Sequence, residues 1–530
     1  MLKLDNLLPI MQELINIESF SSLLHQCPNF FFTLRLVLLV SLIIILYKYF
    51  STTSINSPPS PPKLPIIGNL HQLGLRPYRS LHALSRCHGP LMLLHFGSVP
   101  VLIVSCAETA REVLKTHDLI FCNRPKITVF GKLLYNYKDV SAAPYGEYWR
   151  QVKSLTVLHL LNNERVRSFR SVREEEIQLM INDINKQSLS SSSKEVNLSK
   201  MFMTLTNDVI SRVALGRKYS DGEDGRMFKE LVGEFMELLG SIYIGDYIPS
   251  LAWLSRVNGM DARLDKVAKK FDDFLEKVVQ DHVVDHSSNV GGNKDQRDFV
   301  DVLLWIQKEN LISFPIKTVT IKALIMDVFA AGTDTYSVIV WAMSELLRHP
   351  MMMKKLQNEV RGIVGNRKEI ITEDDLVEMH YLKAVIKETL RLYPILPILI
   401  PRILTQDVKI NGYDIKANTQ VIVNLWGIAR DPNYYGKPDE FEPERFVNSG
   451  INYKGNDFHY LPYGSGRRSC PAIQFTTVII ELALANVVQK FDWKLPTSAG
   501  GLDMTESKGL TMRKKSPLTA IAVPHRSSAC

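Results

Sequence analysis

The sequence predicts a mainly α-helical protein with small β-sheets, built as one large domain behind a membrane-spanning helix. Long stretches after about residue 80 repeat apolar residues at a spacing near 3.6, the period of an amphipathic helix. Strand patterns are few and short, and the Ser-rich stretch 188–195 and the Gly-rich stretch 287–298 are too short to separate domains. The third observation is a nearly unbroken apolar run at residues 30–50.

The front of the chain reads as an extension and an anchor. Residues 1–29 form an N-terminal extension, in which "LLPIMQELI" fits a short amphipathic helix on a membrane. Residues 30–50, "FFFTLRLVLLVSLIIILYKYF", approach the roughly 20 residues that a bilayer-spanning helix needs. A buried core helix and a cleaved signal are the alternatives, but no basic region precedes the run and no small-residue cleavage site follows it. Positive charge lies on its C-terminal flank, which predicts a retained transmembrane anchor in membrane lipid with the bulk of the chain in the cytosol.

Residues 51–70 are predicted to be a linker with a proline-rich hinge. The stretch "SPPSPPKLPIIGNL" holds five prolines, which fix φ and lack the amide hydrogen. Such a stretch favours a stiff spacer that orients the following domain, 71–530, against the bilayer; an ordinary surface loop is the alternative.

Helical patterns dominate the body. They are "ETAREVLKTH", "SFRSVREEEIQLMINDI", "MFKELVGEFMELLGSI", "RLDKVAKKFDDFLEKVVQDHVVDH", the long stretch 318–348 and "TTVIIELALANVVQKF". Short strand patterns are "LMLLHF", "VPVLIVS", "VKINGYDI" and "TQVIVNLW", and the "NG" at 411–412 suits a hairpin turn.

Charge and cysteine content exclude several classes. The net charge of +8 is spread over 530 residues without Lys/Arg blocks, so a nucleic-acid partner is not expected; a membrane surface or an acidic protein fits better. The six cysteines form no CxxC pair, which disfavours a zinc cluster or a disulfide framework and predicts reduced thiols.

One cysteine stands in an unusual frame, "YGSGRRSCPA" at 463–472. A thiolate at Cys470 would suit haem iron, since a thiolate ligand pushes electron density that favours O–O cleavage. Gly464 and Gly466 would let the backbone approach a flat macrocycle, and Arg468 would pair with a carboxylate of that cofactor. A proline and an apolar helix follow, so the sulfur would lie at a helix N-terminus that favours the anion. The alternative is a glycine-rich turn with an incidental cysteine.

This stretch resembles the cysteine loop of the cytochrome P-450 family, the haem-thiolate monooxygenases, whose pattern is Phe-x-x-Gly-x-Arg-x-Cys-x-Gly. Tyr463 replaces the usual Phe and Ala472 the last Gly. The resemblance spans residues 58–530 with five motifs in the family's order, and its proline hinge and C-terminal ending look most like the plant microsomal branch. It implies the cytochrome P-450 fold.

The other motifs receive their roles from this resemblance. "AAGTDTY" matches the oxygen-binding helix, so Thr335 would hold water on bound oxygen and Asp334 would relay protons; Tyr336 replaces the usual Thr or Ser. "YGEYWRQVK" implies that Trp149 and Lys153 bind a haem propionate. Arg402 is a further propionate candidate, with an ordinary surface arginine as the alternative.

"KETLR" and "PERF" resemble the family's structural Glu-Arg-Arg cluster, here Glu388, Arg391 and Arg445. A buried network of three charges would fix the core on the cofactor side, and these residues are expected to be structural.

The implied function is a monooxygenase that binds haem b through Cys470, uses O2, and receives electrons from NADPH through a partner flavoprotein reductase, with cytochrome b5 as a second candidate partner. Apolar segments around 126–137, 201–205, 326–330 and 395–400 predict a small lipophilic substrate, of terpenoid or phenylpropanoid/coumarin type, with alkaloids open. The expected location is the endoplasmic reticulum membrane, as a single-pass protein of plant secondary metabolism. The alternatives are a reductase-independent haem-thiolate isomerase or dehydratase, and an inactive membrane-tethered binding or scaffold protein.

Overall fold

The fold is described from a computed structural model, which covers residues 28–50, 56–190, 195–219, 222–288, 297–312, 314–365, 369–496 and 501–525. The chain divides into two compact units, Met1–Ser57 and Pro58–Cys530. Residues 1–27, with the predicted amphipathic helix, lie outside the described residues.

The first unit contributes one described helix, α2 (Pro28–Phe50), of 23 residues. Its described side chains, 33–44, are all exposed, and nine of these twelve are large and apolar. Among the described residues, one helical stretch is long and apolar enough to cross a membrane. It is 318–348, which comprises two consecutive helices of the second unit and is mostly buried there. The segment Thr33–Ile44 counts as a shorter apolar helix. The anchor at 30–50 therefore stays a prediction.

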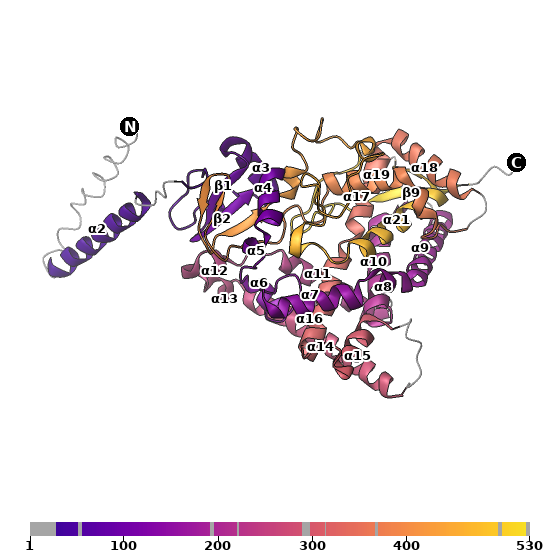
Figure 1. The fold of residues 1–530 in the computed structure, drawn as a ribbon, viewed down its shortest axis with the longest axis horizontal. Helices are drawn as coiled ribbons and strands as arrows, with labels where there is room; N and C mark the ends of the chain where they lie inside the picture. Colours follow the sequence, from indigo (N-terminus) through magenta and orange to yellow (C-terminus); the bar gives the residue numbers. More distant parts are fainter. Residues whose placement is uncertain are drawn as a thin grey trace. The chain divides into compact units, whose positions relative to one another are not determined.

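Helices dominate the second unit (Figure 1), as the 3.6-residue spacing predicts. The helices and helical turns are η2 (Leu70–Gln72), α3 (Pro77–His88), α4 (Ala107–Arg111), η3 (Glu112–Thr116), α5 (Asp118–Phe121), α6 (Thr128–Leu133), α7 (Glu147–Leu155), η4 (Thr156–Leu160), α8 (Asn163–Ser168), α9 (Arg170–Ser190), α10 (Leu198–Leu215), α11 (Gly222–Leu239), α12 (Ile244–Tyr247), η5 (Pro249–Leu251), α13 (Leu254–Val257), α14 (Met260–Ser288), α15 (Phe299–Glu309), α16 (Thr318–Thr333), α17 (Tyr336–Arg348), α18 (Pro350–Val364), η7 (Asp375–Glu378), α19 (His380–Leu392), α20 (Leu425–Ile428), η8 (Pro443–Phe446), η9 (Gly466–Arg468) and α21 (Ile473–Lys490).

Three small sheets complete the described part of the unit. The largest has the order β1 (Leu91–Phe96), β2 (Val99–Val104), β7 (Gln420–Val423) and β4 (Arg402–Ile403), with β2 and β7 parallel and the other pairs antiparallel. The second has the order β3 (Glu195–Asn197), β9 (Thr519–Pro524) and β8 (Phe491–Lys494). The third is the predicted hairpin of β5 (Val408–Ile410) and β6 (Tyr413–Ile415), turned by Asn411 and Gly412 at φ 49° and 85°.

The main hydrophobic core lies among the helices, and two smaller clusters lie on opposite faces of the four-stranded sheet. The main cluster draws on α9, α10, α14 to α19 and α21. Alternate residues of β1 and β2 divide between the two smaller clusters, as side chains of a strand do. The sheet is therefore buried on both sides and connects the start of the unit to residues 402–423.

The proline-rich stretch belongs to the second unit from Pro58 onwards, which is earlier than the predicted domain start at 71. The Leu93 amide donates to the Pro59 carbonyl at 3.0 Å, and the buried Asn69 amide group donates to the Pro61 and Pro62 carbonyls at 3.3 Å. Proline leaves its carbonyl free to accept, so these residues dock on the β1 edge rather than form a free spacer.

The Glu-Arg-Arg cluster forms as predicted. Glu388 and Arg391 are fully buried and make two contacts, Nε to Oε2 at 2.7 Å and an outer nitrogen to Oε1 at 2.8 Å. The Arg445 Nε lies 3.5 Å from the Glu388 Oε1, and a second Arg445 nitrogen lies 2.7 Å from Glu442. The cluster ties α19 to η8 through residues that are far apart in the sequence.

Candidate active site

The loop of residues 463–472 turns tightly before α21. Gly464 and Gly466 adopt φ of 70° and 71°, in the left-handed region that glycine tolerates best. A Cβ on Gly466 would lie 2.2 Å from the carbonyl oxygen of Leu114, so only glycine fits there. The Cys470 amide donates to the Tyr463 carbonyl at 3.0 Å, which closes the turn and fixes the cysteine just before the helix.

Cys470 keeps some accessible surface, although protein atoms surround its thiol on all sides. Burial raises its pKa above the ordinary value, while a hydrogen bond from the Ala472 amide and the charge of Lys153 act in the opposite direction. The helix start therefore favours the anion as expected, but it does not outweigh burial. A bound metal cation would supply the remaining stabilisation, because a coordinating thiol is deprotonated outright.

Arg468 lies beside Trp149, with the guanidinium carbon 4.2 Å from the ring centroid. The Nε and the two terminal nitrogens of its guanidinium donate to the carbonyls of Cys122, Val140 and Ala143, at 2.8, 3.1 and 2.6 Å respectively. The Trp149 indole also donates to Val140, at 2.9 Å, so its donor is directed at the backbone in this structure.

Lys153 and Arg402 reach the same loop from two other elements. Lys153, on α7, donates to the carbonyl of Ser469 at 3.1 Å. Arg402, on β4, is 3% exposed; it pairs with Asp118 at 3.2 Å and donates to the carbonyl of Ser465 at 3.1 Å. Arg402 is therefore a buried arginine beside the cysteine loop and not an ordinary surface residue.

Arg124 is a fourth cation near Arg402 and Arg468, and it was not predicted from the sequence. It is buried, and its guanidinium donates to the carbonyls of Ser141, Ile400 and Pro401 at 2.8, 2.6 and 2.9 Å. The only signal in the sequence is an arginine within the short apolar stretch "LIFCNRP", which does not separate it from any surface arginine.

The four cations create a local excess of positive charge. Burial lowers the pKa of Arg124, Lys153, Arg402 and Arg468, that of Arg468 to about 10, and repulsion between the guanidinium groups adds to the effect at Arg124. Asp118 is the acid that pairs directly with one of them. A ligand with two carboxylates close to the Cys470 sulfur, such as haem with its propionates, would neutralise this excess, so the residues present fit haem.

The predicted long helix 318–348 is interrupted after Thr333. The Thr335 amide donates to Gly332 at 3.2 Å and the Val338 amide to Thr335 at 3.2 Å, so the chain makes tighter three-residue turns between α16 and α17. A Cβ on Gly332 would lie 2.3 Å from the Ile210 side chain on α10, so glycine also permits close packing. The break places Asp334 and Thr335, both buried, at the start of α17.

Asp334 is 1% exposed and forms an ion pair with Arg513 of the C-terminal segment. Burial raises the pKa of the Asp334 carboxyl, and Arg513 and Thr511 oppose that rise. The segment is held against α17 because the Trp341 indole donates to the carbonyl of Met512 at 3.0 Å. Arg513 is partly exposed, so the ion pair links a buried acid to the protein surface.

Apolar residues lie beside the cysteine loop on the segment 395–402. The Leu399 side chain would contact a Cβ on Gly464 at 3.6 Å, and Ile400 supplies a carbonyl to Arg124. Leu399 and Ile400 are only partly buried, and Ala331 on α16 is exposed. Met201 and Leu205 of the candidate segment 201–205 are buried on α10, in the main core cluster against which Ile400 and Cys470 also pack.

The three departures from the family pattern fit locally. The Tyr463 hydroxyl lies 3.4 Å from the Thr477 hydroxyl, which gives it a partner. Ala472 caps α21. Tyr336 lines a pocket of about 250 Å³ with Lys514 and Lys515.

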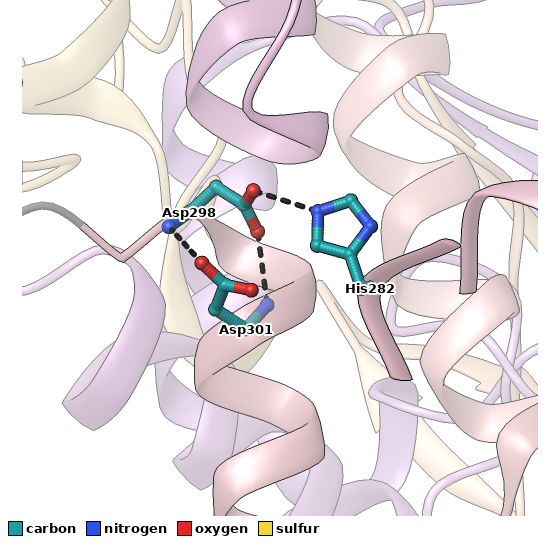
Figure 2. Close-up of side chains that lie close together, drawn as sticks. All are labelled: His282, Asp298 and Asp301. Carbon is teal, nitrogen blue, oxygen red and sulfur yellow. Dashed lines mark hydrogen bonds and ion pairs between the residues drawn. The ribbon is translucent and has the colours of Figure 1, made fainter. Parts of the chain in front are cut away.

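One His-Asp-Asp group has metal-ligand spacing among the described residues: His282, Asp298 and Asp301 (Figure 2). Asp298 and Asp301 form a reciprocal capping box at the start of α15, and the His282 Nε2 lies 2.8 Å from Asp298. The His282 Nδ1 also faces a carbonyl, that of Val278 at 2.8 Å, so both ring nitrogens donate, and the pair with Asp298 raises the histidine pKa to about 9 against the effect of burial. An imidazolium cannot ligate a metal, so this group is a structural ion pair.

Comparisons with known proteins agree on one family. A family model described as Cytochrome P450 matches residues 58–520. The chain is 63% identical over 513 residues to Cytochrome P450 736A117 of Prunus mume, covering 95% of this chain and 98% of that protein. It is 52% identical to Cytochrome P450 71A26 of Arabidopsis thaliana over 93% of this chain and 98% of that protein, and 49% identical to a norfluorocurarine oxidase of Strychnos over 94% and 99%. A solved zebrafish cytochrome P450 with abiraterone superposes with a TM-score of 0.71 at 25% identity, covering 85% of this chain and 100% of that chain.

Proposed function

Because the chain belongs to the cytochrome P450 family, whose members are haem-thiolate monooxygenases, we propose that it is a membrane-anchored enzyme that oxidises a lipophilic plant metabolite of terpenoid or phenylpropanoid/coumarin type. Electrons would come from NADPH through a flavoprotein reductase. The observation that carries this proposal is a cluster of four cations at the loop that holds Cys470. Arg468 lies on this loop, and Lys153 and Arg402 donate to its carbonyls. Arg124 lies close enough to Arg402 and Arg468 for their charges to lower its pKa.

The cofactor site follows from those contacts. Cys470 would ligate the iron of haem b, while Arg124, Lys153, Arg402 and Arg468 would exchange backbone carbonyls for the propionates. When bound, haem supplies the activation of O2 and the oxidation of a C–H bond. The protein's own contribution is to orient the substrate, exclude water and deliver protons.

Proton delivery is assigned to the break between α16 and α17. Thr335 would position water beside the reacting oxygen, and Asp334 would pass protons to it. The Asp334 pKa is raised by burial, so its carboxyl holds a proton more readily than a surface aspartate does. The partly exposed Arg513 gives this acid a connection to solvent.

The substrate class rests on the apolar side chains near the cysteine loop. Leu399 and Ile400 are only partly buried although they are apolar, and the Leu399 side chain lies beside Gly464 of the loop. Such a lining suits a ligand with few charges. The terpenoid and phenylpropanoid classes both satisfy it.

The partner proteins would approach the surface beside the cysteine loop. Exposed cations lie on the loop itself and on two elements that contact it: Arg467 on η9, Lys115 on η3 and Arg150 on α7. A basic surface next to Cys470 suits an acidic electron-transfer protein, the reductase or cytochrome b5. Helix α2 would hold the enzyme in the endoplasmic reticulum membrane as a single span with the catalytic unit in the cytosol.

The test is reconstitution of the full chain with a plant NADPH-dependent reductase in lipid vesicles. We expect water displacement by a substrate to shift the haem spin state in a metabolite panel, and the hits to be oxidised only with NADPH, reductase and O2. Turnover of a hit without reductase would identify the isomerase or dehydratase alternative. Binding without any turnover would identify an inactive binding protein.

A further inference from the structure

Two aspartates, the buried Asp139 and the half-buried Asp327, hold the loop 139–143 and its contact with helix α16. Asp139 is fully buried, and its Oδ2 accepts hydrogen bonds from the Ser141 hydroxyl and from the Ala142 amide at 2.7 Å. Asp327, on α16, accepts from the Val140 amide at 2.6 Å. Among the described residues, no protein donor reaches the other oxygen of Asp139, Oδ1.

The amide that donates to Asp327 belongs to the peptide bond that follows Asp139, which brings the two carboxyl groups to the same short stretch of backbone, where a hydrogen bond between them would satisfy the Asp139 Oδ1. Two carboxylates have no hydrogen to share, so such a contact requires a proton on one of them. Two like charges in contact inside a protein also cannot both ionise readily. A proton on Asp327 would satisfy Asp139 and would leave a single negative charge on the pair.

The loop 139–143 carries the carbonyls that hold the cations described above. Val140 accepts from Trp149 and Arg468, Ala143 accepts from Arg468, and Ser141 accepts from Arg124. The aspartates therefore connect α16, the helix that ends at the Asp334 break, with the groups assigned to the propionates. A loop that separated from α16 would move those groups.

The charged groups around Asp139 and Asp327 are consistent with a single negative charge on the pair. Lys153 on α7 is near Asp327, while Arg124 and Arg468 are near Asp139. Tyr148, also on α7, is near both acids and stays neutral, since burial raises its pKa. Burial raises the pKa of both aspartates, most strongly that of Asp327.

We propose that Asp139 and Asp327 share one proton and act as a positioning pair, which clamps the loop 139–143 to α16 and so holds Arg124, Arg468 and Trp149 in place for the cofactor. The clamp itself is a property of the protein chain, whereas its role toward haem rests on the proposed function. Neither aspartate is a catalytic residue in this scheme.

The shared proton is tested by infrared spectroscopy of the full chain with isotope-labelled aspartate. The spectrum of wild type minus that of Asp327→Asn should show the C=O band of a protonated carboxylic acid. The substitution Asp139→Asn should shift this band, because the hydrogen-bond partner of the acid changes. The matched control is Asp272→Asn. Asp272 lies on α14 and pairs with Lys322 of α16, the helix that carries Asp327, but its side chain is half-exposed. Absence of the band from the Asp327→Asn difference spectrum would mean that both carboxylates are ionised and would overturn the proposal.

The clamp is tested by amide hydrogen exchange in peptides that cover 139–143. Asp327→Leu removes the acceptor for Val140 and the donor for Asp139, so exchange should accelerate about 10- to 100-fold, the effect expected for losing a hydrogen bond to a charged or acidic group. Asp327→Asn supplies an amide that can replace both hydrogen bonds, so protection should return to within about threefold of wild type.

Equal exchange in wild type and Asp327→Leu would overturn the positioning role. Asp327→Asn exchanging as fast as Asp327→Leu would also do so. Both measurements can be made on haem-free protein. A failure of the proposed function, such as a chain that never binds haem, is therefore distinguishable from a failure of the clamp.

Discussion

Replacement of Arg391 by methionine tests how much of the fold depends on the buried charge cluster. The guanidinium makes two contacts to Glu388 at 2.7 and 2.8 Å, and both side chains have no exposed surface. It also donates to the carbonyls of Ala429, Pro438 and Glu440 at 2.8, 2.7 and 3.1 Å. Arg391→Met leaves a buried carboxylate with a weak second partner, and breaking such a pair costs about 3–5 kcal/mol.

The three orphaned carbonyls raise that cost, by about 1 kcal/mol or more in total. A domain is stable by about 5–15 kcal/mol, so the variant should lose a large part of its free energy of unfolding. Urea titration followed by circular dichroism measures the loss, with Arg86→Met on α3 as the control, since Arg86 is exposed and should change the free energy of unfolding by under about 0.5 kcal/mol. If Arg391→Met lowered the free energy of unfolding by less than about 1 kcal/mol, the reasoning on buried charge would be refuted.

Three further substitutions test other parts of the site. Gly466→Ala should reduce the fraction of protein with a haem-thiolate spectrum, because its Cβ would lie 2.2 Å from a backbone carbonyl at positive φ; a wild-type fraction would contradict this. His282→Gln should cost on the order of 1–2 kcal/mol at pH 6 and little above pH 10, because the pair with Asp298 raises the folded-state pKa to about 9, so its stabilisation is complete below the unfolded value near 6.5 and is lost as pH rises through 9. If His282→Gln lowered the free energy of unfolding equally at both pH values, the charged pair of His282 and Asp298 would not be the source of the stabilisation. Gly332→Val should lower the free energy of unfolding by about 1–3 kcal/mol through the clash with Ile210. Adding Ile210→Ala to the same chain should restore part of that free energy. If it restored none, the loss would not come from the contact with Ile210.

Local patterns predicted much of the secondary structure. The β1 run and the Asn411-Gly412 turn were visible because alternation and a residue pair that favours positive φ act over a few positions. The break between α16 and α17 does not follow from the apolar spacing of residues 318–348, which continues through it. The docking of the prolines from Pro58 was missed, because it depends on hydrogen bonds to β1 and not on the stiffness of the segment.

Some residues of the candidate site could likewise be recognised from a local sequence pattern, and others could not. Cys470 and its glycines could be singled out as a candidate because a sulfur, two glycines and an arginine lie within ten positions, and the role of the sulfur stays a prediction. Arg124 and the Asp139 and Asp327 pair were not, because their partners lie up to 277 residues away and nothing near them in the sequence is unusual. Lys153 and Arg402 were assigned by resemblance, and their contacts with the cysteine loop are consistent with it.

The most direct measurement of the central claim is the absorption spectrum of the purified full chain, reduced under carbon monoxide. We expect wild type to absorb at the long-wavelength position that marks a thiolate ligand, and Cys470→His to bind haem without this band. A wild-type protein whose reduced iron is held by nitrogen, or a Cys470→His variant that keeps the wild-type band, would contradict the assignment of this sulfur as the ligand.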